Sequence, residues 1–317
     1  MSRCAVALLA AALLLAGHAR AAESRAFAFA VVGDTPYFAL EDPLFRNMLA
    51  SLDAEDLAFI VHVGDFKSGD SPCSDAVFQE RREWFAASRH ALVYVPGDND
   101  WSDCRRESAG RYDPSERLGK LRELFFSGDT SLGRGAIPVQ RQSADPRFPA
   151  VRENLRWRMG PYLFATLNLP GGNNNRGRGA EPSAEFRGRM AANRAWLEEA
   201  FQRAKEDNAA ALFLFFHANP VWERGADSAP RDGYREFRAQ LAESARPFGR
   251  PVVAVHGDTH TFRVDRPLRD PRSGEPVAGL TRIESFGSPA MGWVRVELDP
   301  GARDWIRIEG RRFPPQE

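Results

Sequence analysis

Short apolar runs alternate with longer amphipathic stretches through the first part of the chain. The runs over 26–32, 57–63 and 91–95 predict strands, and each is closely followed by Gly-Asp. Between them, helices are predicted to begin near Asp42 and Ser74, residue types that favour helix starts. This strand–helix–strand repetition indicates βαβ units and a largely parallel sheet.

The second half of the chain continues this pattern and then changes it. Strands are predicted over 162–167, 211–216 and 252–255, and helices over 185–206 and 234–245. Beyond Leu280 the residues alternate between apolar and polar and are punctuated by glycine. This alternation predicts antiparallel strands that complete a second sheet.

The segment 101–154 differs from its surroundings. It is rich in Gly, Pro, Arg and Ser, and it contains one predicted helix over 114–126. We interpret it as a long surface excursion beside the strand ends.

The first residues have the pattern of a secretory signal peptide. Arg3 precedes an uninterrupted run of Ala, Val and Leu over 5–16, and the small residues Ala19 and Ala21 fit a cleavage site. The run is too short to span a bilayer, and no later stretch is long and apolar enough to do so. We therefore expect cleavage after Ala21, export to the periplasm or beyond, and one mature domain over 22–317.

Charge gives no indication of a polyanionic partner. The 43 basic residues balance the 43 acidic ones, and no block of like charge resembles a nucleic-acid-binding arm. The short Arg-rich stretches are interpreted as solvated surface. Nothing in this pattern indicates an oligomeric state.

Cysteine usage agrees with export. Cys4 lies in the predicted signal peptide, which leaves Cys73 and Cys104 in the mature chain. In an oxidising compartment an even pair favours one disulfide. A metal-ligand pair is the alternative, although no CxxC spacing supports it.

Polar residues of metal-binding type follow five of the predicted strands. Carboxylate, amide oxygen and imidazole donors together suit ions such as Mn, Fe, Zn or Ni. Ligands of open α/β sheets bind beyond the carboxyl ends of the strands. The candidates are Asp34, Asp65, Asp98, Asn99, Asp100, His217, His256, Asp258 and His260.

This ordered series resembles the calcineurin-like metallophosphoesterase superfamily, whose blocks read GDxH, GDxx, GNH plus an acid, a lone His, and GHxH. All five blocks occur in order between about Ala26 and Thr261. The resemblance implies an α/β fold, a four-layer α/β sandwich with two central mixed β-sheets flanked by helices. It also implies two divalent or trivalent metal ions (Mn, Fe, Zn or Mg) and a hydroxide between them that attacks phosphorus.

Carried over by position, the resemblance implies most of the metal ligands. Asp34 matches an acid that binds the first metal, and Asp65 matches the acid that bridges both. His217 matches the lone His, a ligand of the second metal. In the last block Asp258 replaces the first His, and His260 keeps the second.

The third block leaves two alternatives open. Either Asp98 binds the second metal, or the loop shifts by one residue and Asn99 does. Asn99 otherwise stands where the family has a His that assists catalysis, and Asp100 matches the acid that orients this neighbour. His256 is either a replacement ligand or a supporting partner, so Asn99, Asp100 and His256 are the candidate catalytic residues.

Two further features lie near the positions where this sequence differs from the family's blocks. Pro36 stands where the family has its first-block His, and Tyr37 either fills that gap as a phenolate or packs, the interpretation we favour from sequence. The glycine- and asparagine-rich loop over 171–179 either contacts substrate phosphate or is a solvated surface loop.

The sequence therefore predicts an exported metal-dependent phosphoesterase acting on a small phosphorylated substrate, a phosphomonoester or a phosphodiester. The alternative is a periplasmic protein of the same fold that binds metal or a phosphorylated ligand with weakened catalysis.

Overall fold

The computed structural model describes residues 25–224, 231–270 and 273–314, and the predicted signal peptide lies outside them. The first sheet begins with three parallel strands, β1 (Phe27–Val32), β2 (Phe59–His62) and β3 (Ala91–Tyr94). Helices α2 (Glu41–Leu52) and α3 (Asp75–Ala87) join them. The βαβ prediction is therefore confirmed over this part of the chain.

The second sheet has seven strands, in the order β4-β5-β6-β7-β8-β10-β9. Its parallel strands are β6 (Tyr162–Thr166), β7 (Ala211–Phe215), β8 (Val252–His256) and β10 (Leu280–Glu284). The antiparallel ones are β4 (Gln140–Arg141), β5 (Leu155–Met159) and β9 (Arg263–Asp265).

The last two strands correct the prediction for the C-terminal region. Strands β11 (Gly292–Leu298) and β12 (Ile306–Arg312) are antiparallel as expected. They extend the first sheet, whose order is β12-β11-β1-β2-β3, and Phe29 lies opposite Val296. Of the three C-terminal strands only β10 joins the second sheet, where it runs parallel to β8 and antiparallel to β9. Alternation marks a strand without identifying its neighbour or its direction.

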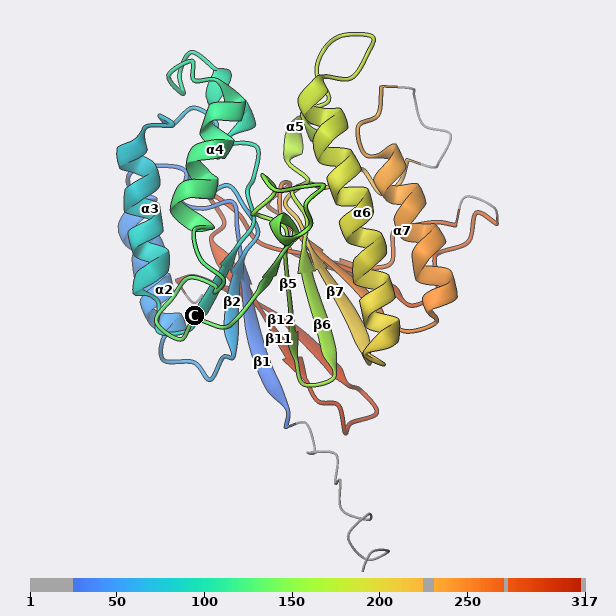
Figure 1. The fold of residues 1–317 in the computed structure, drawn as a ribbon. Helices are drawn as coiled ribbons and strands as arrows, with labels where there is room; N and C mark the ends of the chain where they lie inside the picture. The colour runs from blue at the N-terminus through green and yellow to red at the C-terminus, as the bar shows by residue number, and fades with distance from the viewer. Residues whose placement is uncertain (1–24, 225–230, 271–272, 315–317) are drawn as a thin grey trace, which may run out of the picture.

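The helices cover the outer faces of the two sheets (Figure 1). Helices α2 and α3 lie on one side, and α6 (Ala184–Glu206) and α7 (Arg235–Phe248) lie on the other. The predicted helix in the segment 101–154 is α4 (Pro114–Phe125), which packs beside α3. The predicted four-layer α/β sandwich with two central mixed sheets is confirmed.

Aromatic side chains fill the space between the sheets. Phe29 of β1 stacks on Phe59 of β2 with ring centroids 4.8 Å apart. Across the gap, Phe29 meets the edges of Phe164 and Phe213 at 5.9 and 5.7 Å. All four rings are fully buried. Such rings bury large apolar areas, so they fix the spacing of the strand ends that carry the site.

Helix starts follow the local sequence. The side chains of Ser74 and Ser183 accept hydrogen bonds from the backbone N–H three residues later. Helix α2 begins at Glu41 without a side-chain cap. The carboxylate of Asp42 pairs with Arg81 at 2.9 Å instead of capping this helix.

The predicted disulfide is confirmed. Cys73 and Cys104 are bonded, with their Cα atoms 5.7 Å apart. The bond joins the segment after β2 to the short helix η1 (Ser102–Arg105), which follows β3. It therefore ties together two of the segments that follow strand ends.

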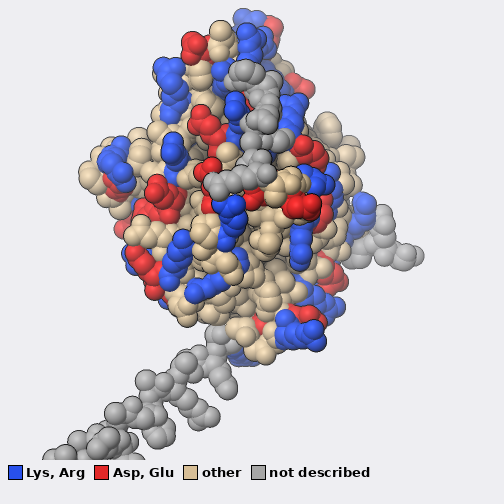
Figure 2. Space-filling view, turned by 90° about the vertical axis from the view of Figure 1, so that its right-hand side faces the viewer, with Lys and Arg blue, Asp and Glu red and all other residues tan. Residues whose placement is uncertain are grey.

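The surface carries mixed charge. Figure 2 shows Lys and Arg interspersed with Asp and Glu on the side that carries α7. Within the described residues, no helix has both the length and the apolar character needed to cross a membrane.

Candidate metal centre

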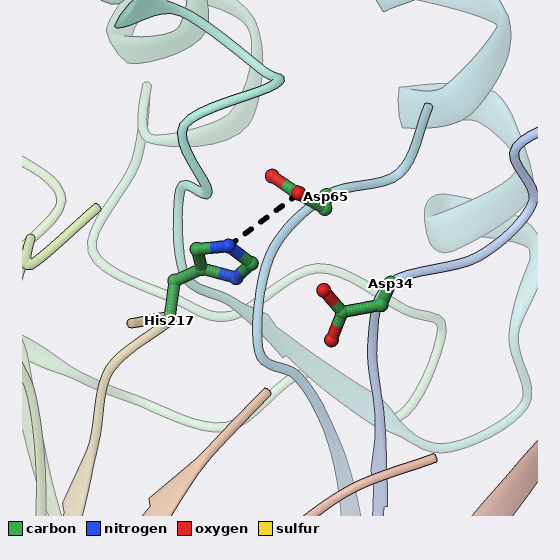
Figure 3. A group of neighbouring side chains, drawn as sticks. All are labelled: Asp34, Asp65 and His217. Atoms are coloured by element: carbon green, nitrogen blue, oxygen red, sulfur yellow. Dashed lines mark ion pairs between the residues drawn. The ribbon is translucent and has the colours of Figure 1, made fainter. Parts of the chain in front are cut away.

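The carboxyl ends of β1, β2 and β7 bring Asp34, Asp65 and His217 together (Figure 3). Nε2 of His217 lies 3.4 Å from Oδ2 of Asp65. One ligand atom from each of the three residues lies within 4.8 Å of the others. Asp34 and His217 are fully buried, and Asp65 nearly so. Buried carboxylates of this kind need a paired positive charge or a metal ion.

A second group shares the same histidine. Nε2 of His217 lies 3.0 Å from Oδ1 of Asp98, which follows β3. Asp258, which follows β8, supplies the third ligand atom, again within 4.8 Å. The backbone N–H of Asp258 also donates to both carboxylate oxygens of Asp34, at 3.1 and 3.0 Å. The two groups therefore form one cluster.

Four of the predicted ligands have a left-handed backbone conformation. The φ angle is 53° at Asp34, 58° at Asp65, 78° at Asp258 and 59° at His260. Non-glycine residues rarely adopt this region, which costs on the order of 1–3 kcal/mol for each residue. Strain concentrated at these positions is typical of a functional site.

Glycines let the strand-end turns approach one another. A Cβ atom at Gly97 would collide with Oδ1 of Asp65, and one at Gly257 would collide with Oδ2 of Asp34. Each glycine precedes a predicted ligand in sequence, yet it makes room for the carboxylate of another block. Any side chain at these two positions would force the cluster apart.

The two histidines of the cluster are held in the same way. Nδ1 of His217 donates to the carbonyl oxygen of Val63 at 2.9 Å, and Nδ1 of His260 donates to that of Ser288 at 2.6 Å. Nε2 of each ring therefore faces the carboxylates, and for His260 the nearest is Oδ1 of Asp34 at 3.5 Å. A carbonyl partner on Nδ1 that aims Nε2 is the usual support for a metal-binding histidine.

The cluster concentrates negative charge in a buried place. Burial raises the pKa of Asp65 well above its ordinary value, and it raises the pKa of Asp258 to about 6. For His217, burial acts to lower the pKa, but nearby carboxylates, Asp65 foremost, raise it well above the ordinary value. The carboxylates thus favour a positive charge here, which a protonated imidazole or a metal ion can supply.

Tyr37 points its hydroxyl into the cluster, so packing alone does not describe it. The hydroxyl donates to Oδ2 of Asp65 at 2.9 Å and lies 3.4 Å from Oδ1 of Asp34. It also lies 3.2 Å from Nε2 of His260, and the amide of Asn99 donates to it at 3.2 Å. Burial first, then Asp65 and Asp34, raises the pKa of Tyr37. The only sequence signal was its place three residues after Asp34.

Asn99 and Asp100 share a turn but have different environments. The backbone N–H of Asn99 donates to Oδ1 of Asp65 at 3.0 Å, and its side chain faces Tyr37. Asp100 is fully buried, and its Oδ2 accepts from the backbone N–H groups of Asp65 and Gly97 at 2.9 and 2.8 Å. Asp100 therefore fixes the backbone of both turns, which makes it a positioning residue.

His256 lies beneath the cluster. Its Nδ1 donates to the carbonyl oxygen of Gly257 at 2.9 Å, and its Nε2 accepts from the indole N–H of Trp222 at 3.1 Å. Burial lowers the pKa of His256 to about 3, so the ring is neutral. Both ring nitrogens are occupied, and this geometry gives no support to a ligand or catalytic role.

The glycine-rich loop begins as a tight turn against the cluster. The turn α5 (Gly171–Asn174) includes left-handed residues, with φ of 58° at Gly172. A Cβ atom at Gly171 would lie 2.5 Å from Oδ1 of Asp98 and 2.9 Å from Oδ1 of Asp258. Asn174 is fully buried. This part of the loop is therefore a wall of the site rather than a solvated segment.

Arg106 brings a cation to the edge of the cluster. A Cβ atom at Gly69 would collide with its Nη1 and would lie 2.7 Å from Oδ1 of Asn99. The guanidinium pairs with the buried carboxylate of Asp103, and the Arg106 side chain is 47% exposed. The sequence pattern had placed this arginine in a solvated stretch.

The donors fit metal ions bound through oxygen and imidazole. In the described residues both cysteines are joined in the disulfide, so neither offers a thiolate. Carboxylates with imidazoles suit Mn, Fe, Zn or Mg rather than a soft ion. The residues that would hold them are Asp34, Asp65, Asp98, His217, Asp258 and His260, with Tyr37 and Asn99 adjacent.

The fold is shared with solved structures that include phosphatases. No protein-family profile matches the sequence, and no curated protein is significantly similar to it. A dimetal phosphatase from Danio rerio superposes with a TM-score of 0.52 at 14% identity, covering 90% of this chain and 96% of that one. PhoD gives a TM-score of 0.56 at 14% identity, covering 93% and 73%.

A third solved structure extends this likeness. Purple acid phosphatase PPD1 from yellow lupin (Lupinus luteus) seeds gives a TM-score of 0.57 at 13% identity and covers 92% of this chain. The alignment covers 52% of the lupin protein, so this chain spans about half of its length. The chain has the fold of the calcineurin-like metallophosphoesterases. The order of the five blocks in the sequence predicted this fold.

Proposed function

We propose that this protein is an exported, metal-dependent phosphoesterase that hydrolyses a phosphomonoester or a phosphodiester. The observation that carries the proposal is the orientation of His217 and His260. Each ring is held through Nδ1 by a backbone carbonyl and presents Nε2 to buried carboxylates. The fold shared with dimetal phosphatases supports the same function.

The carboxylates of the cluster supply negative charge that would bind metal ions for this chemistry. When bound, divalent or trivalent ions neutralise phosphoryl oxygens and lower the pKa of a water molecule that can attack phosphorus. The carboxylate of Asp65 contacts both His217 and the hydroxyl of Tyr37. Its Oδ1 is held by the backbone N–H of Asn99. Asp65, which matches the bridging acid of the resembled family, would hold metal together with Asp34 and His217.

Arg106 and Asn99 would orient the phosphoryl group. Arg106 is half-exposed, and its guanidinium lies beside the amide of Asn99 at the edge of the cluster. A guanidinium recognises phosphate oxygens through charge-assisted hydrogen bonds. The turn at Gly171 packs closely against the carboxylates of Asp98 and Asp258.

Export is part of the proposal. The N-terminal pattern of Arg3 and the apolar run over 5–16 is that of a signal peptide. The Cys73–Cys104 bond fits an oxidising compartment such as the periplasm.

The alternative function is binding of metal or a phosphorylated ligand with weakened turnover. It is favoured by Asn99, which stands where the resembled family has a histidine that assists catalysis. A general acid contributes roughly 10²–10⁴-fold to rate, so its loss would lower turnover without abolishing binding.

Hydrolysis of p-nitrophenyl phosphate and bis-p-nitrophenyl phosphate tests the proposal. The mature protein would be assayed with added Mn, Mg, Zn or Ni and with a chelator. We expect metal-stimulated, chelator-sensitive turnover, and the preferred ester separates a monoesterase from a diesterase. Metal binding without turnover of either ester would support the alternative.

A further inference from the structure

A large pocket opens beside the metal centre. It has a volume of about 950 Å³ and shares His260 with the cluster. We call it the aromatic pocket; its lining includes His260, Phe262, Phe286, Trp293, Arg311 and Arg312. Nε2 of His260 faces Asp34, and the side chain is 29% exposed and lines the pocket, so the pocket begins at the edge of the cluster.

Aromatic rings form one wall of the pocket. Phe262 and Phe286 stack with their centroids 5.1 Å apart and their planes 19° apart. Phe286 and Trp293 are nearly buried, whereas Phe262 is half-buried and keeps part of its surface open. A pocket of this size and lining is typical of sites that take a small organic group.

The arginines of the pocket have different partners. Arg311 pairs with Glu55 at 3.0 Å and with Glu309 at 3.2 Å, so its charge is balanced. Arg312 is exposed, and no carboxylate of the described chain lies within ion-pair distance of it. Its guanidinium lies over the ring of Phe286, 5.6 Å from the centroid. A planar guanidinium in this place can cover a further ring and attract an anion.

We propose that the aromatic pocket binds the organic group of the phosphate ester, and that this group is an aryl or heteroaryl ring. The inference rests on the proposed function, because His260 must lie beside the bound phosphoryl group. Phe262 and Arg312 both lie against Phe286, and a further ring can lie on the open part of Phe262 or on the exposed guanidinium of Arg312. An aliphatic or sugar group offers no π-face to Arg312.

Binding of two phosphonates that differ only in the organic group tests this inference. Phenylphosphonate and methylphosphonate carry the same anionic group and are not cleaved as esters, so leaving-group reactivity does not enter. Calorimetry on the metal-loaded mature protein should show phenylphosphonate binding about tenfold tighter or better, since a ring is buried. Turnover of p-nitrophenyl phosphate is measured on the same samples.

Two variants locate the effect. Arg312→Ala and Phe262→Ala should each reduce the preference for phenylphosphonate by about threefold or more. Arg307→Ala is the matched control, since Arg307 lies on the same strand, is exposed and does not line the pocket. Arg312 is exposed, so its removal leaves the core intact even if Phe262→Ala disturbs packing.

The outcomes separate this inference from the proposed function. Equal affinity for both phosphonates, with turnover intact, overturns the inference alone. A preference that survives both variants overturns it as well. Absence of bound metal, phosphonate binding and turnover in the unaltered protein overturns the proposed function together with the inference.

Discussion

The hydroxyl of Tyr37 lies 2.9 Å from Oδ2 of Asp65, although 28 residues separate the two in the chain. The same hydroxyl contacts His260 and Asn99. Tyr37 therefore occupies the part of the cluster where Pro36, which cannot coordinate, replaces a histidine of the resembled family. An oxygen here can compensate for the missing imidazole as a ligand or as a hydrogen-bond partner of the ligands.

Tyr37→Phe should weaken metal binding. We expect the affinity for the first metal to fall by about 10–100-fold, because the substitution removes a hydroxyl that contacts Asp65 and His260. Metal titration by calorimetry measures this. Tyr162→Phe is the control, since the Tyr162 hydroxyl is buried without a hydrogen-bond partner in the described structure. Equal metal affinity in both variants would show that the Tyr37 hydroxyl does not support metal binding.

The positions of the cluster residues in sequence predicted much of the site. Asp34, Asp65 and Asp98 each follow one of the three parallel strands of the first sheet. Parallel strands present their carboxyl ends at the same edge, so residues that follow them meet. His217 and His260 were predicted on the same basis and lie in the same cluster.

Side-chain direction could not be predicted in the same way. His256 ends β8, a strand buried on both faces, so periodicity does not show which face its ring takes. Its ring points to Trp222 and away from the cluster. The direction of Tyr37 depends on the left-handed turn at Asp34, which the sequence does not encode in any simple pattern. The sequence did not predict that β11 joins the first sheet, because strand pairing depends on the tertiary structure.

Arg106→Ala should weaken substrate binding while leaving the metal in place. We expect KM for p-nitrophenyl phosphate to rise about tenfold or more, because a charge-assisted hydrogen bond to the phosphoryl group is lost. Metal content should stay unchanged, since Arg106 touches the edge of the cluster only. Arg111→Ala is the control, because Arg111 is 68% exposed and pairs with the exposed Glu107. An unchanged KM in Arg106→Ala would argue against phosphate contact.

Removing the disulfide should destabilise the fold. The bond joins two residues that are separated by 31 positions in the sequence. A disulfide that closes a loop of this length contributes about 3–4 kcal/mol to the free energy of unfolding. Replacing both Cys73 and Cys104 by Ala should therefore lower the urea midpoint markedly. If the midpoint were the same as that of the unaltered protein, the bond would contribute nothing to stability.

His256 gives stability a pH dependence. Burial lowers its pKa from 6.5 to about 3 in the folded state. Between these values the unfolded chain binds more protons, so this contribution is complete above pH 6.5 and is lost as the pH falls toward 3. From pH 7 to pH 5 the loss is about 2 kcal/mol.

His256→Gln isolates this effect. Glutamine offers an acceptor to the indole of Trp222 but does not titrate. Urea unfolding of both proteins is measured at several pH values. The free energy of unfolding of the unaltered protein should fall relative to that of His256→Gln as the pH falls. A stability difference that stays constant from pH 7 to pH 5 would show that His256 does not titrate as its burial requires.

The amount of metal bound by the unaltered protein and by Asp65→Asn, determined by mass spectrometry, tests the central claim most directly. Asp304→Asn is the matched control, since Asp304 is an exposed carboxylate outside the cluster. We expect about two metal ions per chain in the unaltered protein and in the control, and a clear loss in Asp65→Asn. No bound metal in the unaltered protein, or equal metal content in all three, would contradict the account.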